Sequence, residues 1–213
     1  MKIWRYMDLA KFISLLSNRA LYFSNASKFN DPYEFFLNEQ YMKKFKKDDL
    51  IDYEDFFNEI KKSFKKNFAV TCWHINEYEN EALWKIYTNQ GQGIAIETTN
   101  SKLKKSLNFD KEIKFSKVKY EKMDIKNYIP GVTKRKAFEY EKEYRGIVFL
   151  NENEFGESFY IKTDLDILIE KIHISPLMPK YFSDSIKYLC QGELSFLQDR
   201  IVHSKLYDEY ENN

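Results

Sequence analysis

The chain has 213 residues, enough to bury one sizeable hydrophobic core, so we expect a single domain. Its formal net charge of +1 gives no overall signature of a nucleic-acid binder, although lysine clusters such as Lys134–Lys136 leave a local contact open. Two cysteines without CxxC spacing argue against structural zinc and against a disulfide scaffold. Since no long apolar segment is present, we expect a cytoplasmic protein without membrane insertion.

Short apolar runs along the chain predict strands separated by short helices. The strands are predicted at residues 3–6, 21–24, 70–73, 94–97 and 147–150, and further strands at residues 113–120 and in the second half of 161–174. This alternation lacks strong βαβ periodicity. It therefore predicts an α+β fold with mixed, mostly antiparallel sheets and short helices.

The predicted helices begin at polar capping residues. Asp8 is expected to cap a helix with one apolar stripe, and Asn80 or Glu81 to start a short helix that carries Trp84 and Tyr87 on one face. A further helix is predicted at residues 181–190, whereas residues 200–206 fit either a strand or a helix end. The basic amphipathic stretch 48–67 predicts a helical insertion that spans about residues 37–67.

The segment 138–150, FEYEKEYRGIVFL, combines clustered charges with an apolar run. Side chains alternate along a strand, so an extended conformation would place Glu139, Glu141, Glu143 and Arg145 on one face. Carboxylates at that spacing repel one another and raise one another's pKa, which indicates a cation, a hydroxyl-rich ligand or solvent opposite them. The alternative is a solvated strand end in which Arg145 is the internal partner.

The common catalytic fingerprints are absent from the sequence. There is no GxSxG, HExxH, Walker loop or Rossmann fingerprint, and the three histidines are dispersed. The FNDPYE run at residues 29–34 predicts a turn around Asn30, and Glu34 in it needs a partner, for which Arg5 and Arg145 are the candidates.

An ordered set of short motifs resembles the bacterial domain-of-unknown-function family 2971. The motifs are W-R-Y, L-Y-F-S, F-N-D-P-Y-E, C-W-x-x-N, L-W-x-x-Y-x-x-x-x-x-G, K-V-x-Y and Y-E-x-E-Y-R, which span residues 3–145. The sequence departs from that family at Trp73, where the family more often has Phe, and in its lysine-rich insertion. The family name carries no mechanism.

The order of these elements is also similar to that of the ADP-ribosyltransferase superfamily. This resemblance implies NAD as the substrate, Arg5 at the pyrophosphate, Tyr87 at the nicotinamide pocket, and Glu143 at the nicotinamide ribose, with Glu141 completing an E-x-E pair. It also implies transfer of ADP-ribose to a macromolecule or hydrolysis of NAD, as in a defence or toxin protein. The further residues placed at the NAD site are Tyr6, Ser24, Asn30, Trp84 and Arg145, of which Ser24 is the poorer match.

Two other functions fit the same residues. The first is a non-catalytic module that binds a nucleotide or a partner protein, in which Arg5 pairs with Glu34 or Glu143 and Trp84 is a core residue. The second is a metal-dependent nuclease that holds Mg²⁺ on Asp31, Glu34, Glu141 and Glu143, because clustered carboxylates bind hard cations.

Overall fold

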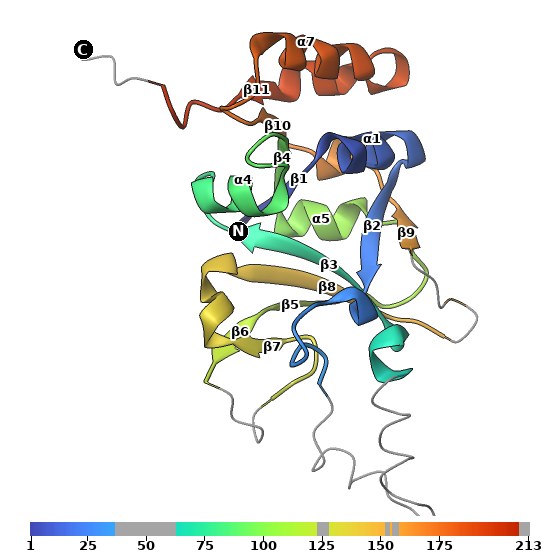
Figure 1. The fold of residues 1–213 in the computed structure, drawn as a ribbon. Coiled ribbons are helices and arrows are strands. Elements are labelled where there is room, and N and C mark those ends of the chain that lie inside the picture. Colours follow the sequence, from blue (N-terminus) through green and yellow to red (C-terminus); the bar gives the residue numbers. More distant parts are fainter. Residues whose placement is uncertain (37–62, 123–127, 152–153, 155–157, 209–213) are drawn as a thin grey trace, which may run out of the picture. The chain divides into compact units, whose positions relative to one another are not determined.

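The computed structural model describes the chain except for residues 37–62, 123–127, 152–153, 155–157 and 209–213 (Figure 1). The chain clusters into two compact units, each made of separate segments. Unit 1 consists of Met1–Leu21, Trp73–Phe109 and Ile161–Asn213, and unit 2 of Tyr22–Cys72 and Asp110–Tyr160. Strand pairing is mostly antiparallel and the helices are short, so the predicted α+β class is confirmed.

Unit 1 contains the strand order β11–β10–β4–β1 (Figure 1). These strands are β1 (Lys2–Met7), β4 (Ile94–Thr99), β10 (Lys171–Ile174) and β11 (Ile201–His203). The β1–β4 and β4–β10 pairs are antiparallel, whereas β10 and β11 are parallel. The end of β3 (Phe68–Ile75) joins the same sheet beside β1, with Ile3 opposite Ile75.

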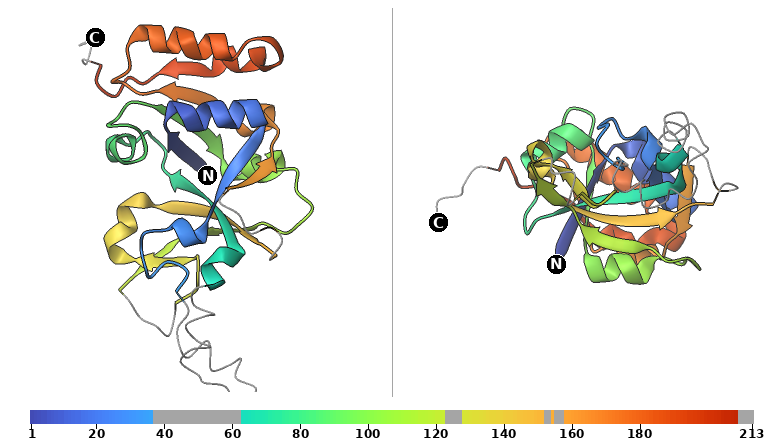
Figure 2. Two further views of the ribbon diagram at one scale, coloured as in Figure 1. Left: turned by 45° about the vertical axis from the view of Figure 1, so that its right-hand side comes forward. Right: turned by 90° about the horizontal axis from the view of Figure 1, so that it is seen from below.

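Short helices surround these strands. They are α1 (Leu9–Asn18), α4 (Glu81–Tyr87), α5 (Asn100–Ser106), α6 (Leu165–Leu168), α7 (Lys180–Leu189) and the 3₁₀ helix η5 (Gly192–Arg200). The predicted caps are confirmed, since Asp8 accepts a hydrogen bond from the backbone N–H of Lys11 at 2.8 Å and Asn80 from that of Leu83 at 3.2 Å. Helix α7 runs along β11 (Figure 2).

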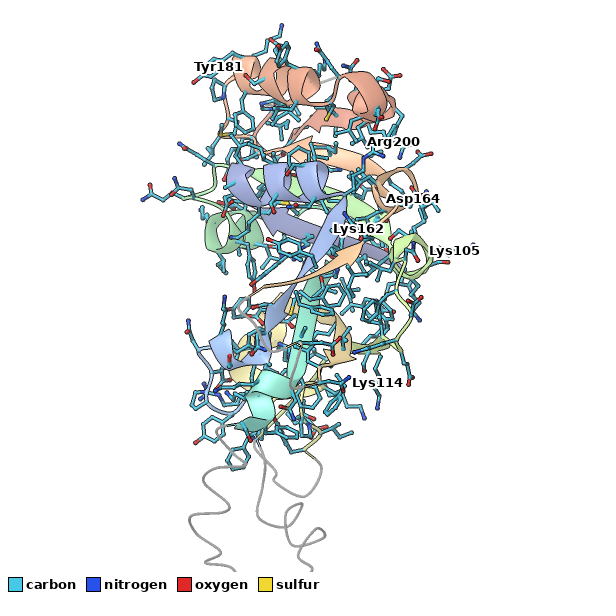
Figure 3. All side chains as sticks on the ribbon, turned by 90° about the vertical axis from the view of Figure 1, so that its right-hand side faces the viewer. Lys105, Lys114, Lys162, Asp164, Tyr181 and Arg200 are labelled. Carbon is cyan, nitrogen blue, oxygen red and sulfur yellow. The ribbon has the colours of Figure 1, made fainter. Side chains whose placement is uncertain are left out.

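Polar side chains fix the ends of the C-terminal elements of unit 1. Asp164 caps α6 by accepting hydrogen bonds from the backbone of Asp166 and Ile167. Arg200, at the end of η5, donates to the carbonyl oxygens of Asp166 at 2.8 Å and Ile169 at 2.5 Å. Asp164 and Arg200 are labelled in Figure 3. These bonds tie η5 to the loop before β10.

The strand register decides which side chains of β1 meet the core of unit 1. Trp4 lies opposite Glu97 and Tyr6 opposite Ala95, so Trp4 and Tyr6 share one face of the sheet. Trp84 of α4 packs edge-on against Tyr6, with 5.0 Å between ring centroids. One core cluster therefore consists of Trp4, Tyr6, Leu83, Trp84 and Ala95.

Unit 2 is built from strand pairs and short 3₁₀ helices. It contains the later part of β2 (Ala20–Asn25) and the first parts of β3 and of β9 (Ser158–Lys162). Its other strands are β5 (Lys114–Lys117), β6 (Lys119–Glu121), β7 (Thr133–Arg135) and β8 (Glu143–Phe149). Its 3₁₀ helices are η1 (Ala26–Lys28), η2 (Lys65–Asn67) and η3 (Lys136–Glu141). The β2–β3 and β5–β8 pairs are antiparallel, and β6 and β7 are parallel.

The core of unit 2 is rich in aromatic side chains. Its buried cluster consists of Ala26, Phe35, Val70, Val132 and Ile147, with Phe29, Phe64, Phe68 and Cys72 packed against it. Gly131 sits beside this cluster at a φ of +75°, where a Cβ atom would lie 2.7 Å from the Phe35 ring. A glycine at this position therefore meets both a backbone and a packing requirement.

The structure confirms most predicted elements and corrects one. The strands at residues 3–6, 21–24, 70–73 and 94–97 are present with slightly wider bounds, and 113–120 contains β5 and β6. The extended conformation predicted from residue 138 is wrong, because Lys136–Glu141 form a 3₁₀ helix and the strand begins only at Glu143. This part of the segment has no apolar alternation to hold it in a sheet.

Two other expectations concern the insertion and the membrane. The proposed helical insertion lies largely outside the described residues. In the described part of the chain, no helix combines the length and the apolar character of a membrane span.

Candidate functional site

Unit 2 contains a buried group of five charged side chains, which we call the charge network. Each of its members is at most 7% exposed. The members are Glu34, Lys134, Glu141, Glu143 and Arg145. Ionised groups are rarely buried unless they are paired, so the geometry of these pairs decides what the network can do.

Arg145 of β8 binds two of the carboxylates. Its Nη2 lies 2.6 Å from Oε2 of Glu34, and its Nε donates to Oε2 of Glu143. The remaining nitrogen, Nη1, donates to the carbonyl oxygen of Gly131 at 3.2 Å. The guanidinium carbon lies over the ring of Phe29, 5.4 Å from the ring centroid. Arg145 is therefore the internal partner of Glu34 that the sequence suggested, and this expectation is confirmed.

Lys134 of β7 binds the same carboxylates from another side. Its ammonium nitrogen lies 3.1 Å from Oε1 of Glu34 and 3.1 Å from Oε1 of Glu143, and it also donates to Oε2 of Glu141. The ring of Phe138 lies 4.6 Å from this nitrogen. One ammonium group therefore meets three carboxyl groups. Glu143 contacts a cation through each of its two oxygens.

The backbone around η3 brings Glu141 and Glu143 to the same cations. Lys142 between them has a φ of 39°, in the left-handed region, so the chain turns sharply where the 3₁₀ helix ends. The backbone N–H of Glu143 then donates to the Tyr120 hydroxyl at 2.7 Å, and β8 begins. The two glutamates converge through this turn and not through the alternation of a strand.

The FNDPYE turn supplies the third carboxylate. Asp31 stabilises the turn by accepting a hydrogen bond from the backbone N–H of Tyr33 at 3.0 Å. It also pairs with Arg135, whose Nη2 lies 3.1 Å from Oδ1 of Asp31. Glu34, three residues later, reaches Lys134 and Arg145. The turn is thus fixed at both its acidic positions.

Three carboxyl groups face two cations in the network, so one carboxyl group lacks a full positive partner. Burial raises the pKa of Glu141 to about 7, with a further increase from its hydrogen bond to Glu143. Burial opposes ionisation of Glu143 too, but Arg145 and the hydrogen bond from Glu141 hold its pKa well below the usual range. Burial lowers the pKa of both cations, but the three carboxylates around Lys134, and Cys72 together with Glu143 and Glu34 around Arg145, raise both pKa values overall. Protonation of Glu141 makes the network neutral.

The pair Glu141 and Glu143 can therefore do acid–base chemistry. Neighbouring carboxyl groups whose environments drive their pKa values apart are typical of sites where one acts as an acid or base and the other remains ionised. Tyr140, which hydrogen-bonds to Glu141, is about half exposed, so this part of η3 borders solvent.

The carboxylates are not arranged as metal ligands. Lys134 and Arg145 occupy their oxygens, and the described residues contain no group of three or more His, Cys, Asp or Glu side chains that could hold a metal ion.

The structure places the predicted site residues in both units. Glu141, Glu143 and Arg145 meet in the charge network of unit 2. Ser24 and Asn30 also belong to unit 2, but they take no part in the network; the Ser24 hydroxyl donates to the carbonyl oxygen of Asn25 at 3.5 Å, and Asn30 is exposed.

The remaining predicted residues belong to unit 1. Tyr6 and Trp84 belong to the buried core cluster of unit 1. Their polar atoms have partners there, since the Tyr6 hydroxyl accepts a hydrogen bond from the backbone N–H of Asn80 at 2.8 Å and the Trp84 indole donates to Glu79 at 2.9 Å. Arg5 lies on the other face of β1, with its guanidinium group over the Trp73 ring at 5.6 Å. Tyr87, at the end of α4, is 41% exposed.

The sequence reasoning missed Lys134. It took the Lys-Arg-Lys run as a possible local contact for a nucleic acid, whereas Lys134 is buried and contacts all three carboxylates. Alternation along β7 gives no signal for Lys134, because Thr133 and Lys134 are both buried.

A second polar group in unit 1 is centred on the buried Glu97. Glu97 accepts a hydrogen bond from Nε2 of His173 at 2.8 Å and lies 3.1 Å from the ammonium group of Lys2. The His173 ring packs against Trp4, with 4.7 Å between centroids, and burial lowers the pKa of this histidine. These contacts of Glu97 join β10, β4 and β1.

Comparisons with protein-family profiles, with curated proteins and with solved structures find no match for this chain.

Proposed function

We propose that the protein is an NAD-using enzyme of the ADP-ribosyltransferase kind, in which Glu141 exchanges a proton and Glu143 remains a carboxylate. The observation that supports this proposal is the E-x-E pair itself. One of its members has a pKa near 7, and the other is held ionised by Lys134 and Arg145.

The proposed reaction breaks the bond between nicotinamide and ribose. The bonding electrons leave with nicotinamide, and the ribose carbon develops positive charge, as in glycoside hydrolysis. The negative charge of Glu143 stabilises that state. A hydroxyl group of the acceptor, or water, then bonds to the ribose carbon and gives its proton to ionised Glu141. A base with a pKa near 7 suits this step at neutral pH.

We propose roles for the two glutamates that differ from those implied by the resemblance. Glu143 was expected to be the main catalytic carboxylate, but both of its oxygens already contact cations. We therefore assign the proton transfer to Glu141. Arg5 and Tyr87 remain proposals for NAD binding, whereas Tyr6 and Trp84 are buried in the core of unit 1.

Release of nicotinamide from NAD tests this proposal. We expect Glu141→Gln to lower kcat by about 10²-fold or more and to remove the inflection near neutral pH from the pH–rate profile. Glu139→Gln is the matched control, because Glu139 is an exposed member of the same helix that pairs only with Lys136 in the described structure. No nicotinamide release by the parent protein, or equal rates for the two variants, would refute the enzyme proposal.

A second candidate is a non-catalytic module that binds a nucleotide or a protein. It is favoured by the internal pairing of the charge network, whose members are at most 7% exposed and bind one another. Such a network also fits a purely structural role. Isothermal titration with NAD separates the two candidates, since the module would bind a ligand without releasing nicotinamide.

A further inference from the structure

Two cationic side chains that lie outside the charge network meet at the FNDPYE turn of unit 2. Arg135 of β7 binds the Asp31 carboxylate with one edge of its guanidinium group, since Nε lies 3.2 Å from Oδ2 and Nη2 lies 3.1 Å from Oδ1. Lys65 of η2 donates from its ammonium group to the backbone carbonyl oxygen of Asp31 at 3.3 Å. We call Lys65, Arg135 and the adjoining ring of Tyr33 the turn site.

The guanidinium group of Arg135 is held in one orientation. Besides its two contacts with Asp31, it lies 5.0 Å from the centroid of the Tyr33 ring and 5.3 Å from that of the Phe138 ring. A guanidinium group is planar, so the edge that carries Nη1 points away from the carboxylate. Nη1 has solvent access and no hydrogen-bond partner among the described residues, and 37% of the side chain is exposed. Arg135 therefore presents a fixed pair of N–H donors to a ligand.

The turn site carries more positive than negative charge. Asp31 balances Arg135, whereas Lys65 forms no ion pair with any described residue. Burial lowers the pKa of the Lys65 ammonium group, although Glu34 and Asp31 oppose this effect. A partly buried ammonium group without a carboxylate partner would be stabilised by an anion. Because Lys65 and Arg135 both contact Asp31, one ligand with two phosphate groups can reach both.

Tyr33 adds an aromatic surface beside these charges. Its side chain is 40% exposed, although the Arg135 guanidinium group covers part of the ring. Its backbone is fixed at both ends, because its N–H donates to Oδ1 of Asp31 at 3.0 Å and its carbonyl oxygen accepts from the Tyr128 hydroxyl at 2.6 Å. Exposed aromatic rings beside cations are surfaces on which nucleobases stack. Phosphate groups are bound by guanidinium and ammonium groups, so the turn site matches both parts of a nucleotide.

We propose that the turn site binds a nucleoside diphosphate, with the phosphate groups at Lys65 and Arg135 and the base against Tyr33. This proposal goes beyond the proposed reaction, because it uses no residue of the charge network and requires no bond to break. Binding of ADP is measured apart from release of nicotinamide from NAD. The two proposals can therefore fail separately.

Isothermal titration calorimetry with ADP is the measurement, and adenosine and inorganic pyrophosphate are the comparison ligands. We expect ADP to bind about 10-fold or more tightly than either of its parts, because the phosphate groups and the base both contribute. Lys65→Gln should weaken ADP binding by about 10-fold. Arg135→Lys keeps a positive charge beside Asp31 but loses the fixed Nη1 edge, so it should weaken binding as well. Lys66→Gln is the matched control, because Lys66 is the exposed neighbour of Lys65 in η2.

A second pair of variants separates the ring from the charges. Tyr33→Phe keeps the aromatic surface, whereas Tyr33→Leu removes it. We expect the leucine variant to lose the preference for ADP over pyrophosphate and the phenylalanine variant to keep it. Absence of ADP binding, equal ADP affinity of the Lys65 and Lys66 variants, an unchanged preference in the leucine variant, or tighter binding of a thymidine oligonucleotide without a terminal phosphate would each overturn the proposal.

Discussion

Replacement of Arg145 by leucine tests whether the charge network stabilises unit 2. Arg145 is 1% exposed and contacts Glu34 at 2.6 Å, Glu143, and the carbonyl oxygen of Gly131 at 3.2 Å. The variant would leave two buried carboxylates with Lys134 as their only cation among the described residues. Removing one partner of a buried ion pair typically costs about 3–5 kcal/mol, so we expect a loss of that size in the free energy of unfolding.

The measurement is urea unfolding at pH 7, followed by tryptophan fluorescence and circular dichroism. Adding Glu143→Gln to Arg145→Leu should restore part of the loss, because the unpaired charge is removed with its partner. Lys85→Gln is the control, since Lys85 and Glu81 form an exposed pair with 60% and 50% of their side chains accessible. Such exposed pairs contribute little to stability.

The pH dependence gives an independent check. In the parent protein the pKa of Glu143 is lowered, so its contribution to stability is present above its ordinary pKa of 4.5 and is lost as the pH falls below that value. Without Arg145 the pKa of Glu143 rises, and the variant should instead gain stability relative to the parent as the pH falls from 7 toward 5. A loss below about 1 kcal/mol at pH 7, with no change in pH dependence, would refute the reasoning.

Three further predictions concern other parts of the structure. The pKa of Glu141 is raised from 4.5 to about 7, so its contribution to the free energy of unfolding should fall as the pH rises from 4.5 to 7. In urea unfolding, the Glu141→Gln variant should not show this fall in the free energy of unfolding. Gly131→Ala should destabilise the protein by about 1–3 kcal/mol in thermal unfolding, because its Cβ would lie 2.7 Å from the Phe35 ring at a φ of +75°; no measurable loss would contradict the packing described. Burial raises the pKa of Cys72 and raises that of Cys190 to about 11, so iodoacetamide should label both thiols slowly at pH 8 until urea is added, and rapid labelling without urea would contradict this.

The strands were predictable where apolar residues dominate. β1, β3 and β4 follow from short runs of apolar and β-branched residues, which need no tertiary information to be found. The 3₁₀ helix before β8 was missed, because its sequence is charged and its conformation is set by contacts of Glu141 with Lys134. Local patterns do not report such contacts.

The candidate site was predictable in part. The sequence indicated that Glu141, Glu143 and Arg145 belong together and that Glu34 needs a cation. It did not indicate Lys134, because a lysine within a basic run resembles a solvated residue. The division into two units was equally hidden, since each unit collects separated segments and no Gly/Ser-rich linker marks a boundary.

The order of strands in unit 1 has a consequence for synthesis of the chain. β1 pairs with β4, and β4 also pairs with β10, which is encoded more than seventy residues later. On the ribosome, the edge of β4 that pairs with β10 therefore stays unpaired while the whole Asp110–Tyr160 segment of unit 2 is synthesised. Unit 1 is expected to complete its sheet only at the end of translation, and a ribosome stalled before Lys171 should carry a nascent chain in which β4 is open to chaperones.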